Sequence, residues 1–560
     1  GNNPNPKSEV IMNMNPTQNI FWRRSFALLP ALCLLAVLAV FSGMDMASAA
    51  PTPDAKPSLA AKEQDHETTT ADHSKFEALQ KDFKKGPEVT AACLSCHNEA
   101  GTQFQKTIHW TWMCPKAEPE AKLGKAGHVV NNFCIAVPSN EPRCTSCHAG
   151  YGWKDKNFDL SVQENIDCLV CHEQTGTYKK FPTGAGNPVS EPTVFKGNKK
   201  TYLPPEWKKV AQSVGRPTRR NCGTCHFYGG GGDGVKHGDL DSSMMKPSKS
   251  LDVHMAVDGK NFNCTRCHET AAHGIAGRCY KTPAAEDRRS LVDFDKIKRI
   301  TCESCHTTTP HKTLLKANDH TDKVACQTCH IPEFARVNPT KMWWDWSKAG
   351  KKKDGKPFVT KDEYGKPNYH TKKGEFRWEK NVKPEYAWFN GVILNTMVTD
   401  KIDPSGVVKL TKLDADRSDP NARIYPFKVH RGKQPYDKIN QTMVIPKLFG
   451  KKGSGAYWAE YDWKKAIQAA MDYSQVPFSG EYDWVETEYQ FQITHMVAPK
   501  EKALACTECH SKEGRMANLA GFYMPGRDAS RSLNVIGWGS VLVALISVLL
   551  HGTVRMIRRK

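Results

Sequence analysis

The stretch CLSCH at residues 93–97 decides how this sequence is interpreted, because the same Cys-x-x-Cys-His spacing returns seven more times. The further units are CTSCH at 144–148, CLVCH at 168–172, CGTCH at 222–226, CTRCH at 264–268, CESCH at 302–306, CQTCH at 326–330 and CTECH at 506–510. This spacing is the attachment site of c-type haem, in which two thiols add to the haem vinyl groups and the histidine ligates the iron. Zinc would not require a histidine after every second cysteine. The sequence therefore predicts eight covalently bound haem c groups.

The attachment residues of these units fall into two sets. The cysteines are Cys93, Cys96, Cys144, Cys147, Cys168, Cys171, Cys222, Cys225, Cys264, Cys267, Cys302, Cys305, Cys326, Cys329, Cys506 and Cys509. The predicted proximal iron ligands are His97, His148, His172, His226, His268, His306, His330 and His510.

The composition favours an interior that is not a plain hydrocarbon core. The 560 residues include 20 Cys and 21 His, and the apolar fraction of 39 % is below the roughly 45–50 % that is usual for globular chains. The 14 Trp and 22 Phe are too many for a disordered chain. These values exclude an ordinary cytosolic enzyme with an aliphatic core.

The charge balance is basic, with 79 Lys and Arg against 59 Asp and Glu and a net charge of +20. Eight haems would bring about sixteen propionates, which would balance most of this excess. We find no nucleic-acid-binding motif and expect no nucleic-acid partner. The remaining positive potential suits a small oxyanion substrate.

Residues 1–49 are predicted to contain a signal peptide with some preceding residues. Arg23 and Arg24 precede an uncharged run over residues 25–44, and an Ala-Ser-Ala sequence at 47–49 follows it. This order is typical of a signal peptide with its cleavage site. The run is long for such a region, so an uncleaved anchor is the alternative. Export agrees with haem c, which is attached on the periplasmic side of a bacterial membrane.

A second apolar run, residues 533–554, has 22 residues without a formal charge. At about 1.5 Å per residue it is long enough to cross a hydrocarbon layer of about 30 Å. Residues 555–560 hold Arg555, Arg558, Arg559 and Lys560, and basic flanks stay in the cytoplasm. The sequence therefore predicts a single C-terminal anchor in the bacterial inner membrane, with the haem region in the periplasm.

Between these ends we expect four segments. Residues 50–90 form a linker and a short helix, residues 91–330 hold seven haems, residues 331–510 are loop-rich and then helical with the eighth haem, and residues 511–532 are a linker. Helix-like runs lie near 456–473 and 481–497. With seven motifs in the 238 residues from 93 to 330, we expect packed haems to form the core. The predicted fold class is a mainly α multihaem cytochrome c with few short strands.

Histidines outside the motifs supply candidates for the second axial position of each iron. Several come within eleven residues of a motif, as is common for ligands of neighbouring haems. The candidates are His109, His237, His254, His273, His311, His320, His430 and His495. His66, His73 and His551 are not expected to ligate, and His128 and His370 are left undecided.

The order of the motifs, seven close together and the last after a long gap, resembles the octahaem tetrathionate reductase family. The matching stretches are HWTW at 109–112, NNFCI at 131–135, NEPRCTSCHAGYGWKD at 140–155, CGTCHFYGGGGDGVKHGDLD at 222–241 and CHIPEFAR at 329–336. The resemblance covers most of residues 90–510. It implies a periplasmic, mostly helical protein in which a chain of haems transfers electrons. It also implies that the second motif carries one catalytic haem, which is ligated by its own histidine and by a lysine.

The resemblance also implies the residues of that catalytic site. We match the lysine to Lys236, with Asp233 three residues before it, and Lys154 is the alternative. The family also has a cysteine over this iron, which we match to Cys134. A lysine amine ligates only when neutral, so it can leave as ammonium, and Asp233 could hold the ammonium or relay protons. A Cys134 thiolate could attack a sulfur–sulfur bond.

Three further cysteines, Cys114, Cys134 and Cys279, lie between the signal peptide and the anchor but outside the motifs. An odd number in an oxidising compartment leaves at least one unpaired. A Cys114–Cys279 bridge would leave Cys134 as a thiol, whereas a Cys114–Cys134 bridge would remove it. The sequence leaves both pairings open.

Two functions are compatible with these features. The first is a reductase of tetrathionate, or of nitrite and hydroxylamine. The alternative is a non-catalytic, membrane-anchored electron-transfer conduit. The predicted anchor contains no histidine pair for b haems, so we expect electrons from a separate membrane quinol dehydrogenase or cytochrome b.

Overall fold

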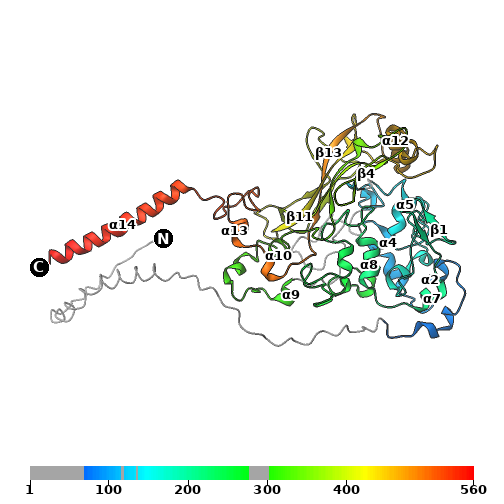
Figure 1. The fold of residues 1–560 in the computed structure, drawn as a ribbon, viewed down its shortest axis with the longest axis horizontal. Helices are drawn as coiled ribbons and strands as arrows, with labels where there is room; N and C mark the ends of the chain where they lie inside the picture. Colours follow the sequence, from blue (N-terminus) through cyan, green and yellow to red (C-terminus); the bar gives the residue numbers. More distant parts are fainter. Residues whose placement is uncertain (1–68, 115–118, 134–135, 276–301, 560) are drawn as a thin grey trace, which may run out of the picture. The chain divides into compact units, whose positions relative to one another are not determined.

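The computed structural model describes residues 69–114, 119–133, 136–275 and 302–559. The chain divides into two units, residues 1–63 and 64–560, and all described residues belong to the second. The predicted signal peptide, Cys134 and Cys279 lie outside the described residues. Figure 1 shows the order of the helices and strands along the chain.

Short helices build the region that holds the first seven motifs. They are α2 (Gly86–Leu94), α3 (Ala100–Gln105), α4 (Ile108–Thr111), α5 (Glu141–Cys144), α6 (Cys168–His172), α7 (Trp207–Gln212), α8 (Arg219–His226), α9 (Cys302–His306) and α10 (Cys326–His330). Several motifs are themselves one helical turn. Residues three and four apart share a helix face, so a helical turn brings both cysteines and the histidine of a motif to one side.

Single 3₁₀ turns connect these helices. They are η1 (His73–Lys75), η2 (Glu77–Leu79), η3 (Pro119–Ala121), η4 (Thr145–Cys147), η5 (Gln163–Asn165), η6 (Ser242–Met245), η7 (Cys264–Arg266), η8 (Ala271–His273), η9 (Leu315–His320), η10 (Trp346–Lys348) and η11 (Lys500–Lys502). The short helix expected before residue 90 is the pair of turns η1 and η2, and the carboxylate of Asp72 caps the first of them.

A nine-stranded sheet lies between the seventh and eighth motifs, where we expected loops and helices. Its strands are β3 (Thr340–Asp345), β4 (Val359–Lys361), β5 (Pro367–His370), β6 (Gly374–Glu379), β7 (Glu385–Phe389), β9 (Val408–Lys409), β11 (Arg423–Asp437), β12 (Thr442–Met443) and β13 (Tyr482–Gln492). The order is β4-β5-β6-β3-β11-β13-β9, and β7 and β12 also pair with β11. Two small hairpins, β1 (Thr193–Phe195) with β2 (Lys200–Tyr202) and β8 (Ile393–Asn395) with β10 (Thr411–Leu413), lie outside it. The structure therefore does not confirm a mainly α fold, and the expectation of few short strands is wrong.

The helix expected near residues 481–497 is the strand β13, antiparallel to β11 from Phe427↔Gln492 to Asp437↔Tyr482. Val485, Thr487 and Phe491 are buried, and all three lie at odd positions. This period of two is the pattern of a strand with one buried face. The other expected helical run contains α11 (Tyr457–Glu460) and the amphipathic helix α12 (Trp463–Ser474).

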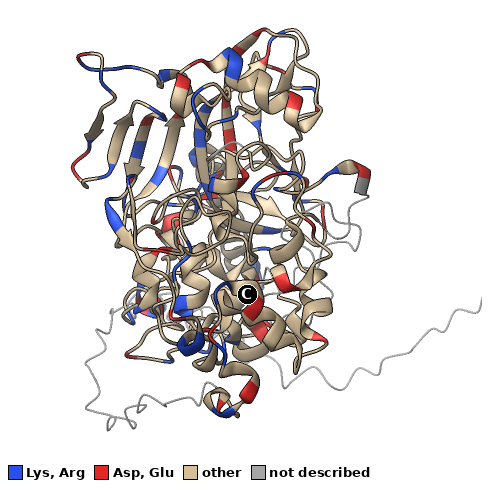
Figure 2. Cartoon of the chain, turned by 90° about the vertical axis from the view of Figure 1, so that its right-hand side faces the viewer, with Lys and Arg blue, Asp and Glu red and all other residues tan. Residues whose placement is uncertain are grey.

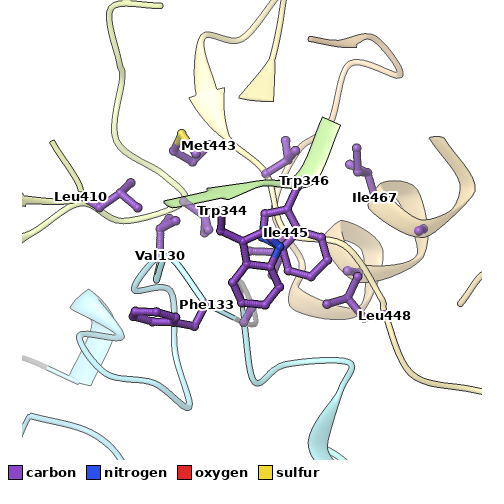
Figure 3. Close-up of a cluster of buried hydrophobic side chains, with 14 of the residues drawn as sticks. Val130, Phe133, Trp344, Trp346, Leu410, Met443, Ile445, Leu448 and Ile467 are labelled. Carbon is purple, nitrogen blue, oxygen red and sulfur yellow. The ribbon is translucent and has the colours of Figure 1, made fainter. Parts of the chain in front are cut away.

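The sheet packs on an apolar core of its own. Trp344 and Trp346 stack with ring centroids 4.5 Å apart. Figure 3 shows them between Phe133 on one side and Leu448 and Ile467 on the other. This core corrects the expectation that packed haems alone build the interior.

The chain ends in α13 (Cys506–Cys509), within the eighth motif, and the long helix α14 (Arg531–Ile557). Helix α14 has 27 residues with a mean hydropathy of 2.2 in its most apolar part, so its length and composition allow it to cross a membrane. It contains the predicted anchor, residues 533–554. Its insertion in a membrane stays a prediction.

The basic residues do not gather on one element. Figure 2 shows Lys and Arg on the strands of the sheet as well as on the short helices. Some of them cover aromatic rings of the sheet, as the amine of Lys341 does 3.7 Å from the ring centroid of Trp344. Part of the excess positive charge is therefore engaged in cation–π contacts.

Candidate functional site

Seven motif histidines each face a second histidine in the described residues. The pairs are His97–His73, His172–His273, His226–His109, His268–His495, His306–His254, His330–His311 and His510–His320, with ring centroids 6.0 to 6.4 Å apart. Two imidazole nitrogens, each about 2.0 Å from one metal ion, place their ring centroids about 6 Å apart. The pairs therefore fit an iron with a histidine on each face.

The hydrogen bonds of these rings support the same fit. In six of them Nδ1 lies 2.9 to 3.2 Å from an oxygen atom, and these are His73, His172, His273, His311, His495 and His510. Metal-binding histidines commonly use their second nitrogen in this way, which leaves Nε2 for the metal. Burial lowers the pKa of His109 to about 4, so its ring is neutral, and the neutral ring is the form that binds a metal.

The structure changes the set of second histidines in two respects. His73, which we did not expect to ligate, faces His97. His237 and His430 were expected ligands, but their rings lie against Phe491 and Phe133, at 5.4 and 4.4 Å. His430 is fully buried in β11. Sequence position alone does not indicate which buried histidines meet a motif histidine after folding.

His148 of the second motif differs from the other seven. It is fully buried, and its Nε2 lies 2.7 Å from the carbonyl oxygen of Trp110. The rings of Trp110, Trp112, Trp153 and Phe158 surround it at 4.7 to 5.8 Å. Nε2 is the atom that would bind iron, so this geometry differs from that expected of a proximal ligand. In the described residues no histidine ring faces it as in the seven pairs.

Lys236, the predicted lysine ligand, is partly buried, and its amine lies 5.6 Å from the ring centroid of Phe491. Burial and the neighbouring amine of Lys125 hold the pKa of Lys236 well below its usual range. Its charge also acts on His226 of the fourth motif. Lys236 is thus a partly buried residue whose amine favours the neutral form.

Asp233, the predicted partner of Lys236, has another role in this structure. Its carboxylate accepts hydrogen bonds from the backbone N–H of Ser242 at 2.8 Å and from the Ser242 hydroxyl at 2.5 Å. These bonds tie the start of the loop 233–238 to η6. A carboxylate that accepts two hydrogen bonds from one residue holds two backbone segments together.

A lysine that the sequence analysis missed holds the middle of the same loop. Lys428 of β11 is fully buried, and its amine donates to the carbonyls of Val235 and Lys236 and to the hydroxyl of Thr340. Burial lowers the pKa of this amine to about 7. A lysine between Phe427 and Val429, in an apolar strand, was the available signal, because buried lysines need partners.

Cysteine side chains of different motifs touch one another. The contacts are Cys93–Cys168, Cys147–Cys225, Cys222–Cys264 and Cys302–Cys326. They join the first motif to the third, the second to the fourth, the fourth to the fifth and the sixth to the seventh. The attachment sites are therefore near neighbours. Repeated Cys-x-x-Cys-His turns, with histidines opposed across the space of one metal ion, define a multihaem c-type cytochrome.

Comparison with known proteins agrees with this class. The family of bacterial cytochromes c matches residues 341–513, and the family of cytochrome c554 and c-prime matches residues 92–173. A crystal structure of an octahaem cytochrome c from Shewanella oneidensis is 47 % identical, with a TM-score of 0.69, over 80 % of this chain and 95 % of that one. An uncharacterised protein of Archaeoglobus fulgidus is 24 % identical over 246 residues, 37 % of this chain and 81 % of that protein. The chain belongs to the octahaem cytochrome c family and carries covalently bound haem c.

Proposed function

We propose that this chain is a periplasmic reductase with eight haem c groups, which passes electrons to the haem on Cys144 and Cys147. The observation that carries the proposal is the contrast between seven opposed histidine pairs and His148, whose Nε2 faces the Trp110 carbonyl. A histidine pair fills both axial positions of an iron and suits electron transfer. Only the second motif has a different environment, and substrate reduction needs an axial position that can open.

A lysine is the ligand that we propose for this haem, whose iron would supply single electrons to a substrate. Lys236 is our first candidate, because its neutral amine is favoured and its charge reaches His226 of the fourth motif. The same fourth motif touches the second through Cys225 and Cys147. Lys154 is the alternative, because it directly follows Trp153, whose ring contacts His148 at 4.7 Å.

Separate substitutions Lys236→Ala and Lys154→Ala test the ligand. We expect eight haems by mass in both variants. The variant that lost the ligand should show a high-spin signal from one haem in eight and bind cyanide more readily, because no amine must be displaced. If neither variant shows a new high-spin haem, the lysine ligand is wrong, and the conduit becomes the better description.

We propose tetrathionate or nitrite and hydroxylamine as substrates, with Cys134 acting on a sulfur–sulfur bond. Steady-state assays of the reduced protein with each compound test the substrate. Cys134→Ser should keep all eight haems, because Cys134 belongs to no motif, and it should impair tetrathionate turnover more than hydroxylamine turnover. Equal losses on both substrates would assign Cys134 a positional role.

We also propose that α14 anchors the protein in the bacterial inner membrane and that a separate quinol dehydrogenase or cytochrome b supplies electrons. The apolar length of α14 supports the anchor. Detergent extraction of the full chain, compared with a chain that stops before residue 531, tests it. Rapid quinol oxidation by the purified chain alone would contradict a separate donor.

A further inference from the structure

A buried ion pair joins the second attachment motif to the third. Lys180 Nζ and Asp167 Oδ2 are 2.9 Å apart, and the two side chains are 5 % and 0 % exposed. The Lys180 ammonium also donates to the carbonyl oxygens of His148 and Gly150, at 2.5 and 3.2 Å. Asp167 Oδ1 accepts from the backbone N–H of Val170 at 3.0 Å and so caps α6, the helix of the third motif. The cation therefore touches the second motif, and the anion touches the third.

Every hydrogen-bonding position of this pair is used. Lys180 donates to three oxygens, and Asp167 also accepts from the hydroxyls of Tyr151 and Tyr178, at 2.7 and 2.8 Å. A lysine has three N–H groups and a carboxylate about four acceptor positions. Burial, followed by the charge of Asp167, raises the pKa of both tyrosines well above the usual range, so both hydroxyls remain donors. Such complete hydrogen bonding is what offsets the cost of burying an ion pair.

The two charges act unequally on the second and third motifs. The Lys180 charge acts on Cys147 and His148, whereas the Asp167 charge acts on Cys168. At Cys171 the two oppose each other. Reduction of a haem adds one negative charge, so a nearby cation raises its reduction potential and a nearby anion lowers it. Burial makes such an effect stronger than it would be at the surface.

We propose that the Lys180–Asp167 pair raises the reduction potential of the haem on Cys144 and Cys147 relative to that of the haem on Cys168 and Cys171. The inference rests on the proposed function only in taking the second-motif haem as the reducing one. In that case the pair draws electrons toward the haem where substrate is reduced. Neither residue contacts the substrate, so both are positioning residues whose charges act through the attachment motifs.

Potentiometric titration of Lys180→Met and Asp167→Asn tests the proposal. The spectroscopic signal of the second-motif haem is identified as the one lost when Cys144 and Cys147 are both replaced by Ala. Lys180→Met should lower the midpoint potential of this haem, with a tenfold change in its electron affinity appearing as about 59 mV. Asp167→Asn should raise it. Opposite signs are the signature of charge, whereas a purely structural role would move both variants in the same direction.

Two further variants keep the test decisive. Lys180→Met leaves a buried carboxylate without its cation, which is destabilising, whereas Lys180→Met/Asp167→Asn leaves no buried charge and should give an intermediate potential. Lys351→Met breaks an exposed pair with Glu375 at 3.2 Å in the sheet region and should shift nothing. Single variants with shifts of the same sign, or with none, overturn the proposal. The titration uses no substrate, so a failure of the proposed reductase activity would leave its result standing.

Discussion

The regions before and after residue 331 make an interior in different ways. In the described part of residues 86–330 no helix exceeds nine residues, and isolated helices of such length are marginal in water. Residues 340–492 instead form a nine-stranded sheet around stacked tryptophans. The first region therefore packs short turns on an apolar cluster that includes Trp110, Tyr151 and Leu169, and we expect covalent haem to add to this support. The second region packs a sheet on a larger apolar cluster.

The two regions also have different roles. The attachment motifs bring cysteines and histidines of neighbouring haems together, while the sheet reaches the loop 234–236 through Lys428 and Thr340 of β11 and β3. The hydroxyl of Thr340 donates to the carbonyl of Gly234 at 2.6 Å. The sheet is thus a rigid support for the loop that carries Lys236.

Removal of haem should produce the largest difference between the two regions. In a chain produced without haem attachment, we expect backbone amides of residues 93–275 to lose more protection from hydrogen exchange than amides of the sheet, because short turns lose part of their support. Amides of β3, β11 and β13 should keep much of their protection. Hydrogen exchange followed by mass spectrometry measures both, with the haem-loaded protein as reference. Equal loss in both regions would show that the sheet depends on haem as well.

Truncation in the sheet core should have the next largest effect. Trp344 is 1 % exposed, and replacing such a side chain by alanine costs about 3–5 kcal/mol. Denaturant unfolding of Trp344→Ala should show this loss in the sheet region, with eight haems and an unchanged haem spectrum. Val359→Ala, at an exposed position of β4, is the matched control and should stay within about 0.5 kcal/mol. A loss of haem from Trp344→Ala would mean that the two regions fold as one.

Removal of one histidine that faces a motif histidine should change one haem and leave the sheet intact. His73→Ala should convert the haem on Cys93 and Cys96 to a high-spin form, because His73 faces His97. His237→Ala is the contrasting variant and should produce no high-spin haem. Electron paramagnetic resonance of the oxidised proteins distinguishes these outcomes. A high-spin haem in the His237 variant would restore His237 as a ligand.

The contact between the regions should give the smallest effect. Tyr473 of α12 donates to Glu141 Oε1 at 2.7 Å, and its loss in Tyr473→Phe should cost about 1 kcal/mol. Burial raises the pKa of Glu141, so the folded state holds this proton more tightly than the unfolded state. Stability should therefore fall as pH rises through the ordinary carboxyl range, and more steeply in Tyr473→Phe, which lacks the donor that lowers this pKa.

Denaturant unfolding on both sides of that range measures the pH effect. Glu141→Gln should remove this part of the pH dependence, because an amide does not titrate there. A pH dependence that is the same in Glu141→Gln as in the original protein would assign the effect to another group.

Much of this protein could be predicted from spacing along the chain. The Cys-x-x-Cys-His units identify haem attachment because the chemistry needs two thiols and a histidine within one helical turn. Six expected histidines, among them His254 and His311, do face motif histidines. The apolar run near the C-terminus is a helix, as its local sequence predicted.

Only the tertiary structure decided which groups meet across long distances in the sequence. The sequence favoured His237 over His73 as a ligand, but only His73 is placed opposite a motif histidine. Strand β11 was missed because it is buried over most of its length, so it has no alternating pattern to indicate a strand. Strand β13 does alternate at Val485, Thr487 and Phe491, but this segment was interpreted as a helix. Lys428 and Lys180 find their partners through folding, since burial forces a charged amine to bond whatever oxygens the fold brings near.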